Sequence, residues 1–480
     1  MNRTLIQQSD HYRKSGFGNV LRSSGIFYYR KDSVFRTTIT FMNYWKVKRG
    51  LDIAVIASLR DNGGELISRE ELAFDQGHVW NYAPAPPSTP FEGSIEIEVF
   101  ALSDMVIPFG AIIAIYETDC SVALTHNYAR IYSSHEIEER RTVTNGEESC
   151  WTLRDGNGVR SFAVFHNGSD LQPAQTAVFA VTNAAGVRQS VETQIPELPP
   201  FATHKFVPAE NFAGLEEFID GQSANGSLSY TLNKAFTRML IGNESIGSGD
   251  IQVTHSNFNY SRHKTDEIDR PGARAYMMMP DAGIEGRRLR IYPDSDVGVY
   301  RMIHSDGRMH EFSNKDVFEL EAPSGVITFA KRDGGLPTRV VTAIVGDAGE
   351  GRVPFELSLG ILHEARPPKR MWWAPIACDD LRDGTLVATI YEELYGPYEG
   401  QPVNIRLYSD KTHGVVEVNL TEKQVRRANE GLRLSEILPE AADHFDGNFG
   451  WFTWYSEYGG FQVFTKLSRA DGNCTMEHGF

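Results

Sequence analysis

The sequence has little cysteine and no long apolar run. Only four of its 480 residues are cysteine, namely Cys120, Cys150, Cys378 and Cys474. Four cysteines in a chain of this length do not form the disulfide framework of a small secreted domain. We expect reduced thiols, with a bridge between Cys120 and Cys150 as the alternative.

The chain also lacks an apolar segment suited to export or membrane insertion. No stretch approaches the roughly 20 apolar residues that span a bilayer. The first eleven residues contain no apolar run typical of a signal peptide. We therefore expect a cytoplasmic protein with no membrane span, and leave export by a non-classical route open.

Positive charge is scarce. The chain has 47 lysines and arginines against 63 acidic residues, a formal net charge of −16 at pH 7. Binding of nucleic acid or of an anionic membrane needs a concentrated basic face, so neither is expected as the main partner. The short basic clusters at residues 46–49 and 287–290 are typical of the solvated face of a strand.

Short catalytic motifs are absent. The sequence contains no phosphate-binding loop, no H-E-x-x-H, no G-x-S-x-G and no paired C-x-x-C. Residues 294–298 are dense in carboxylates but lack the spacing of a calcium loop, which favours a turn. We therefore predict no catalytic residue, no metal and no cofactor, although an active site built from loops would leave no such motif.

What the sequence does contain is a fourfold repeat. A strand that opens on glycine recurs four times, and each copy closes on a histidine. A two-strand unit with an Asn-, Asp- or Gly-rich turn precedes each glycine strand, which indicates a β-hairpin. The repeated residues are Gly93 with His126, Gly226 with His255, Gly325 with His363, and Gly450 with His478.

The apolar pattern supports strands. Ile95, Ile97 and Val99 alternate with Glu96 and Glu98, which predicts one buried face and one face with carboxylates in water. Residues 111–116 and 339–345 are apolar on both faces, as in the central strands of a sandwich, although the first run also lies close to potential sheet edges. Only residues 212–219 and 432–438 place apolar side chains at helical spacing.

The fold class that follows is all-β. We predict four tandem antiparallel β-sandwich domains, immunoglobulin-like or jelly-roll-like, that form divergent internal repeats with short helices in repeats two and four. A chain of 480 residues gives each copy about 120, a normal size for a sandwich. The predicted domains span residues 1–140, 141–272, 273–375 and 376–480.

The repeated histidines have two interpretations. Two imidazoles and a carboxylate can form a zinc or iron site if they converge. In an extended strand, however, His126 and His135 would lie about 30 Å apart, and copies three and four lack a second histidine. We therefore expect His126, His255, His363 and His478 to be structural residues at equivalent domain ends, without a bound metal.

Aromatic residues gather in the fourth repeat. Flat rings stack on sugar faces, so a ligand-binding platform is one interpretation and core packing is the other. Strand alternation puts Trp451 and Tyr455 on one face and Trp454 on the other. The candidate ligand-binding residues are Trp451, Trp454, Tyr455, Tyr458, Trp372 and Trp373.

These observations leave two functions. The first is a non-enzymatic binding or structural assembly protein, whose sandwiches contact other protein chains, including copies of itself, through sheet edges. The alternative is a carbohydrate-binding or carbohydrate-active protein that uses the aromatic cluster of the fourth repeat, with an acid such as Glu457 for chemistry.

Overall fold

The computed structural model describes residues 22–73, 77–101, 111–126, 128–132, 143–146, 148–233, 235–258, 272–284, 286–293, 297–336, 340–346, 353–364, 366–469 and 474–480. Nearly all regular structure in these residues is β-strand, arranged in eight antiparallel sheets. The prediction of an all-β fold with tandem sandwiches is confirmed. No helix in the described ranges is long and apolar enough to cross a membrane.

The first sandwich contains nine strands and a short helix. Its elements are β1 (Arg22–Lys31), β2 (Arg36–Met42), α2 (Tyr44–Arg49), β3 (Ile53–Asp61), β4 (Leu66–Leu72), β5 (Val79–Tyr82), β6 (Phe91–Ala101), β7 (Ile112–Glu117), β8 (Val122–His126) and β9 (Ala129–Ile131).

The second sandwich has the predicted short helices. Its elements are β10 (Val143–Gly146), β11 (Glu148–Leu153), β12 (Val159–His166), β13 (Gln175–Thr182), β14 (Arg188–Ile195), β15 (Thr203–Phe206), α4 (Pro208–Asn211), α5 (Leu215–Ile219), β16 (Ala224–Asn233), β17 (Ala235–Thr237), β18 (Leu240–Ser245), β19 (Ile251–His255) and β20 (Asn257–Phe258).

The third sandwich is formed by strands only in the part that the structure describes. They are β21 (Arg274–Met279), β22 (Arg287–Ile291), β23 (Val299–His304), β24 (Met309–Ser313), β25 (Phe318–Glu321), β26 (Gly325–Lys331), β27 (Thr342–Gly346), β28 (Phe355–Leu359) and β29 (Leu362–His363).

The fourth sandwich has the most helical turns. Its elements are β30 (Met371–Ile376), β31 (Arg382–Ile390), α6 (Glu392–Tyr395), β32 (Val403–Tyr408), β33 (Val415–Leu420), α7 (Glu422–Arg427), β34 (Leu432–Arg433), α8 (Leu434–Ile437), α9 (Ala441–Phe445), β35 (Gly450–Ser456), β36 (Phe461–Arg469) and β37 (Cys474–His478).

The four copies have one topology. The sheets that contain the glycine strand run β4-β3-β6-β1-β9, β14-β13-β16-β11-β20, β24-β23-β26-β21-β29 and β33-β32-β35-β30. In addition, β17 of the second sandwich pairs with β9 of the first, and β10 pairs with β16. The facing sheets run β5-β2-β7-β8, β15-β12-β18-β19, β25-β22-β27-β28 and β34-β31-β36-β37. The strands at Gly93, Gly226, Gly325 and Gly450 are therefore equivalent, and each predicted hairpin is an antiparallel pair.

Two of these glycines show why the position rejects a side chain. A Cβ on Gly93 would collide with the backbone carbonyl of Arg60, and one on Gly450 would collide with the carbonyl of Tyr408. Both carbonyls belong to the last part of the neighbouring hairpin strand. Glycine lets the backbone of the hairpin strand approach the backbone of the central strand closely at this point.

The exact domain boundaries stay predictions. The first lies outside the described residues, since residues 133–142 are not described. The boundary between 375 and 376 falls inside β30, which pairs with β35 of the fourth sandwich. The chain therefore enters its fourth sandwich at or before Met371.

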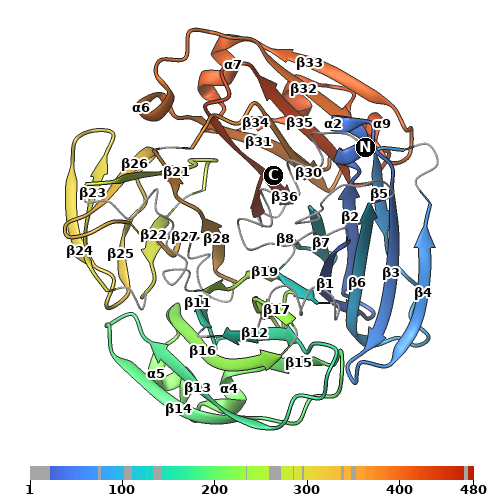
Figure 1. Cartoon of the computed structure of the whole chain (residues 1–480), viewed down its shortest axis with the longest axis vertical. Coiled ribbons are helices and arrows are strands. Elements are labelled where there is room, and N and C mark those ends of the chain that lie inside the picture. Colours follow the sequence, from blue (N-terminus) through green and yellow to red (C-terminus); the bar gives the residue numbers. More distant parts are fainter. Residues whose placement is uncertain are drawn as a thin grey trace, which may run out of the picture.

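The four sandwiches form a closed ring. In Figure 1 they lie around a common centre, in chain order from the first (blue) through green and yellow to the fourth (orange). The last strands of the facing sheets turn toward that centre, and each lies beside the next in the order β8, β19, β28, β37, with β37 again beside β8. The hairpin strands β4, β14, β24 and β33 lie at the periphery.

Apolar side chains fill each junction of the ring. Phe162 and Leu240 of the second sandwich belong to the core of the first, and Cys150 packs with Tyr292 of the third. Phe464 of the fourth sandwich joins the core of the third. A further cluster combines Met42, Val79, Ile113, Ile115, Val122 and Leu124 of the first sandwich with Trp373, Ala377, Tyr408, Phe449, Trp451 and Leu467 of the fourth.

One expectation about strand environment is wrong. Glu96 and Glu98 are buried, because Arg22 forms ion pairs of 3.0 and 2.8 Å with them and Arg69 forms one of 2.7 Å with Glu98. Burial raises the pKa of Glu96, and the Arg22 charge opposes that rise. The apolar run at residues 111–116 contains β7, which lies next to β8 at the end of its sheet, and β8 in turn contacts β19 and β37.

The four cysteines are free thiols, which confirms the absence of a disulfide framework. Cys150 and Cys378 are buried, and Cys120 and Cys474 are half-buried. Cys120 donates to the carbonyl of Ser248 at 2.8 Å and so contacts the second sandwich without a bridge to Cys150.

Candidate functional site at the centre of the ring

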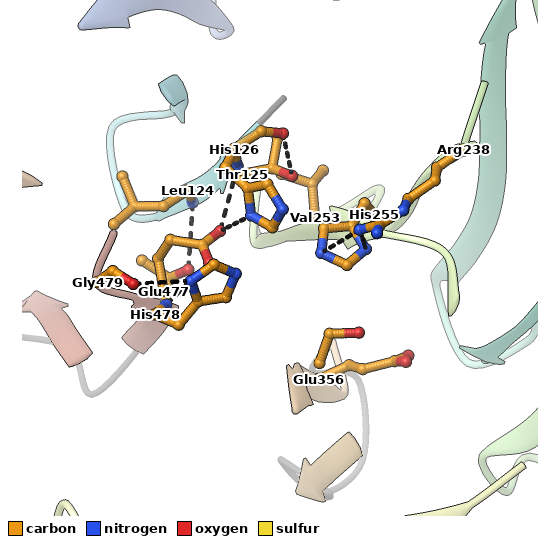
Figure 2. A network of polar contacts seen from close by, with 12 residues as sticks. Leu124, Thr125, His126, Arg238, Val253, His255, Glu356, Glu477, His478 and Gly479 are labelled. Carbon is orange, nitrogen blue, oxygen red and sulfur yellow. Dashed lines mark hydrogen bonds and ion pairs between the residues drawn. The ribbon is translucent and has the colours of Figure 1, made fainter. Parts of the chain in front are cut away.

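Three of the repeated histidines meet at the centre of the ring. His126, His255 and His478 are the last residues of β8, β19 and β37, which are equivalent strands of three sandwiches. The ring centroid of His126 lies 4.4 Å from that of His255 and 4.6 Å from that of His478. Figure 2 shows the three imidazoles side by side. The sequence register predicted equivalence but not this convergence.

The fourth histidine does not take part. In the third sandwich the equivalent strand β28 ends at Leu359, and His363 lies in β29, which pairs with β21 of the other sheet. The expectation of four equivalent histidines is therefore wrong for His363. The signal was present in the sequence, because the separation of Gly325 from His363 is longer than that of the other glycine and histidine pairs.

A buried carboxylate that sequence reasoning missed joins two of the histidines. Glu477 Oε2 accepts the backbone N–H of His126 at 3.2 Å and lies 3.2 Å from His126 Nδ1. Glu477 Oε1 accepts the backbone N–H of His478 at 2.8 Å and lies 3.6 Å from His478 Nε2. Burial raises the pKa of Glu477, and the nearby His478 opposes that rise. Glu477 thus connects the last sandwich to the first.

A buried arginine lies against the third histidine. Arg238 Nη1 is 3.3 Å from both ring nitrogens of His255, and His255 Nδ1 is 2.9 Å from the carbonyl oxygen of Ser256. Arg238 directly follows β17, and it is buried. The guanidinium therefore supplies positive charge beside the histidine cluster (Figure 2).

A second buried carboxylate connects the third sandwich to the second. Glu356 Oε2 accepts the backbone N–H of Thr152 at 2.7 Å, and Oε1 accepts the hydroxyl of Tyr292 at 2.7 Å and the amide of Asn257 at 3.3 Å. Burial raises the pKa of Glu356, and the hydrogen bonds from Tyr292 and Thr152 oppose that rise. Figure 2 shows Glu356 on a neighbouring strand end below the histidines.

A cavity of about 500 Å³ lies between the second and third sandwiches. Its lining includes four cationic side chains, Arg188, Arg288, Arg290 and Lys315, against two carboxylates, Asp316 and Glu319. Asn225 also lines it, and neither the nitrogen nor the oxygen of its buried side-chain amide has a hydrogen-bond partner among the described residues. Glu319 forms ion pairs with Arg288 and Arg290, which leaves Arg188 and Lys315 as the further cations of this lining.

The aromatic cluster of the fourth sandwich is not a surface platform. Trp451 and Trp454 are fully buried and Trp373 is nearly so, while Trp372 and Tyr458 are half-buried. Only Tyr455, at 40% exposure, faces solvent. The predicted alternation is correct, because Trp454 packs inside the sandwich and Trp451 packs on the opposite face. The first sandwich covers Trp451 on that second face, so a sugar cannot reach this ring.

Comparison with known proteins gives no functional assignment. The chain matches no protein family and no curated protein. A solved structure of Bacteroides uniformis beta-glucuronidase 2, covalently bound to cyclophellitol-6-carboxylate aziridine, aligns at 7% identity over 51% of this chain and 27% of its own, with a TM-score of 0.12.

A tetra-tandem repeat from the extending region of a large adhesion protein aligns at 9% identity over 89% of this chain and 91% of its own, with a TM-score of 0.09. The chain therefore spans about a quarter of the glucuronidase and most of the adhesion repeat. Both TM-scores are too low to carry an argument about either fold or function.

The burial of Trp451 gives a stability test with a matched control on the same strand face. Trp451→Ala removes an indole packed between two sandwiches, so we expect it to lower the free energy of unfolding by about 3–5 kcal/mol. Tyr455→Ala on the exposed part of that face should change it by no more than about 0.5 kcal/mol. Urea unfolding followed by circular dichroism measures both, and equal effects would contradict this packing.

Proposed function

We propose that the protein is a non-enzymatic binding scaffold that associates with further copies of itself through the outer edges of its ring. The observation that carries this proposal is a repeated exposed apolar side chain. Leu66, Val187, Met309 and Val415 lie at or just before the starts of β4, β14, β24 and β33, and they are between 43% and 60% exposed.

The outer strands have room for a partner. Each of β4, β14, β24 and β33 is the last strand of its sheet within the described residues. An exposed edge presents backbone donors and acceptors to another chain, and proteins limit such pairing by placing charges on it. Glu70 and Glu71 on β4 and Glu417 on β33 do so here. Because of these charges, a partner is more easily bound through the exposed apolar residues at the strand starts than by pairing a complete strand with the edge.

A second copy is the partner that best fits this pattern. Four equivalent contacts on one ring multiply a weak interaction through effective concentration. In a two-fold contact, the exposed apolar residue at the start of an outer strand would lie against the same residue of a second ring. Because the chain has a net charge of −16, repulsion between copies should oppose association at low salt and be screened at high salt.

The edge proposal predicts association that depends on both concentration and salt. Light scattering coupled to size-exclusion chromatography should give a mass above the 53.8 kDa of one chain, rising with protein and sodium chloride concentration. Replacing Leu66, Val187, Met309 and Val415 together by lysine should leave a monomer.

The control carries the same added charge at exposed apolar residues in turns or loops away from the edges, Val34, Leu171, Ile246 and Leu381. It should associate as the unaltered protein does. A strict monomer under all conditions, or equal loss of association in both variants, would refute the edge proposal.

The cavity between the second and third sandwiches favours a second binding role, recognition of a small anion. Four cations against two carboxylates give its lining a net positive charge in an otherwise acidic chain. A buried amide without partners costs about 1–3 kcal/mol, and a ligand that hydrogen-bonds Asn225 would recover part of this. A carboxylate or phosphate group supplies acceptors for Arg188, Lys315 and the Asn225 N–H.

Anion binding in the cavity is measured by thermal unfolding with citrate or inorganic phosphate at constant ionic strength. We expect the midpoint to rise with either anion, and to rise much less in Asn225→Leu and Arg188→Gln, which remove the amide and one cation. Arg308→Gln, on the β23 to β24 turn away from the cavity, should behave as the unaltered protein. No rise, or the same rise in every variant, would exclude this site.

A further inference from the structure

We infer that His126, Glu477 and His478 form a binding site for a divalent transition metal that joins the first and last sandwiches of the ring. One ligand atom from each of these side chains lies within 4.8 Å of the other two. The set contains two imidazoles and one carboxylate, a combination that binds zinc and iron in proteins. The inference is independent of the proposed self-association.

The separations of the ligand atoms fit a metal of this size. In a tetrahedral zinc site with bonds of about 2.0–2.1 Å, neighbouring ligand atoms lie about 3.4 Å apart. Here Glu477 Oε2 is 3.2 Å from His126 Nδ1, and Glu477 Oε1 is 3.6 Å from His478 Nε2. The two distances involve different oxygens of Glu477, so one ion would take either both oxygens of the carboxylate or one oxygen with a rotation of an imidazole.

The surroundings of the site orient one of the imidazoles for coordination. His478 Nδ1 is 3.1 Å from the carbonyl oxygen of Gly479, so donation there leaves Nε2 as the nitrogen turned to the carboxylate. Histidines that bind metals commonly donate their other ring N–H to a carbonyl or carboxylate in this way. His126 and Glu477 are buried, and His478 is partly exposed, which gives the site a route to solvent.

His255 lies beside this set rather than in it. Its ring packs edge-on against His126, but Arg238 Nη1 is 3.3 Å from both of its nitrogens. A guanidinium in that position competes with a cation for the imidazole. Three protein ligands therefore remain, and the fourth position of a tetrahedral ion would belong to a non-protein ligand.

The metal would stabilise the closed ring by linking its first and last sandwiches. His126 ends β8 of the first sandwich, while Glu477 and His478 end β37 of the last. An ion bound to all three connects elements about 350 residues apart along the chain and stabilises only the closed form. The expectation from sequence that no metal binds rested on the separation of histidines within one copy, whereas the ligands here come from two copies.

Zinc uptake by the full chain tests the site. After chelation and dialysis against limiting Zn²⁺, elemental analysis should give about one zinc per chain, with a higher thermal midpoint than the metal-free protein. Zinc X-ray absorption should report imidazole nitrogen and carboxylate oxygen at about 2.0–2.2 Å. His126→Gln with His478→Gln should weaken zinc binding by at least about 100-fold, as should the milder single change Glu477→Gln.

A second histidine pair provides the matched control. His304 and His310 have ring centroids 4.9 Å apart on the β23 to β24 hairpin, far from the centre of the ring. Their double replacement by glutamine should leave uptake and the absorption spectrum unchanged. Absence of stoichiometric zinc in the unaltered protein would overturn the inference, and so would full uptake in the Glu477→Gln variant or loss of uptake only in the His304 and His310 variant.

Discussion

The contact between the first and fourth sandwiches is the interaction on which the rest of this structure depends. It joins the two ends of the described chain through a buried apolar cluster and several polar pairs. Trp451 Nε1 donates to Thr40 Oγ1 at 2.9 Å, and the Asn81 amide donates to the carbonyl of Phe449 at 2.7 Å. Because this junction closes the circle, no sandwich in the ring has a neighbour on one side only.

Closure also explains why so much polar chemistry is buried at the centre. When four strand ends converge, their polar side chains lose contact with water and must form hydrogen bonds or ion pairs with one another. Glu477 does so between the fourth and first sandwiches, and Glu356 does so between the third and second. The same desolvation that raises the pKa of each carboxyl makes these groups sensitive to any cation or hydrogen-bond donor placed beside them.

Much of the fold follows from local patterns in the sequence. The hairpin turns, the four glycine strands and the short helices near residues 215–219 and 434–437 depend on neighbouring residues, so periodicity and turn chemistry reveal them. The burial of Glu96 and Glu98 does not, because it depends on Arg22, which lies more than 70 residues earlier. Alternation along β6 identified two faces but not what covers them.

The candidate site was only partly visible for the same reason. The repeat register identified His126, His255 and His478. It also predicted an equivalent place for His363, which is wrong because β28 ends at Leu359 and His363 lies in β29. Glu477 had no repeated counterpart and gave no signal. The aromatic cluster suggested an open surface because a single strand cannot reveal that another sandwich covers one of its faces.

The first and fourth sandwiches are in direct contact in the folded protein. A double-mutant cycle with Thr40→Val and Trp451→Phe measures that contact, since the two residues are linked by one hydrogen bond across the junction. We expect a coupling free energy of about 0.5–1.5 kcal/mol in urea unfolding. Strictly additive effects of the two changes would contradict a closed ring.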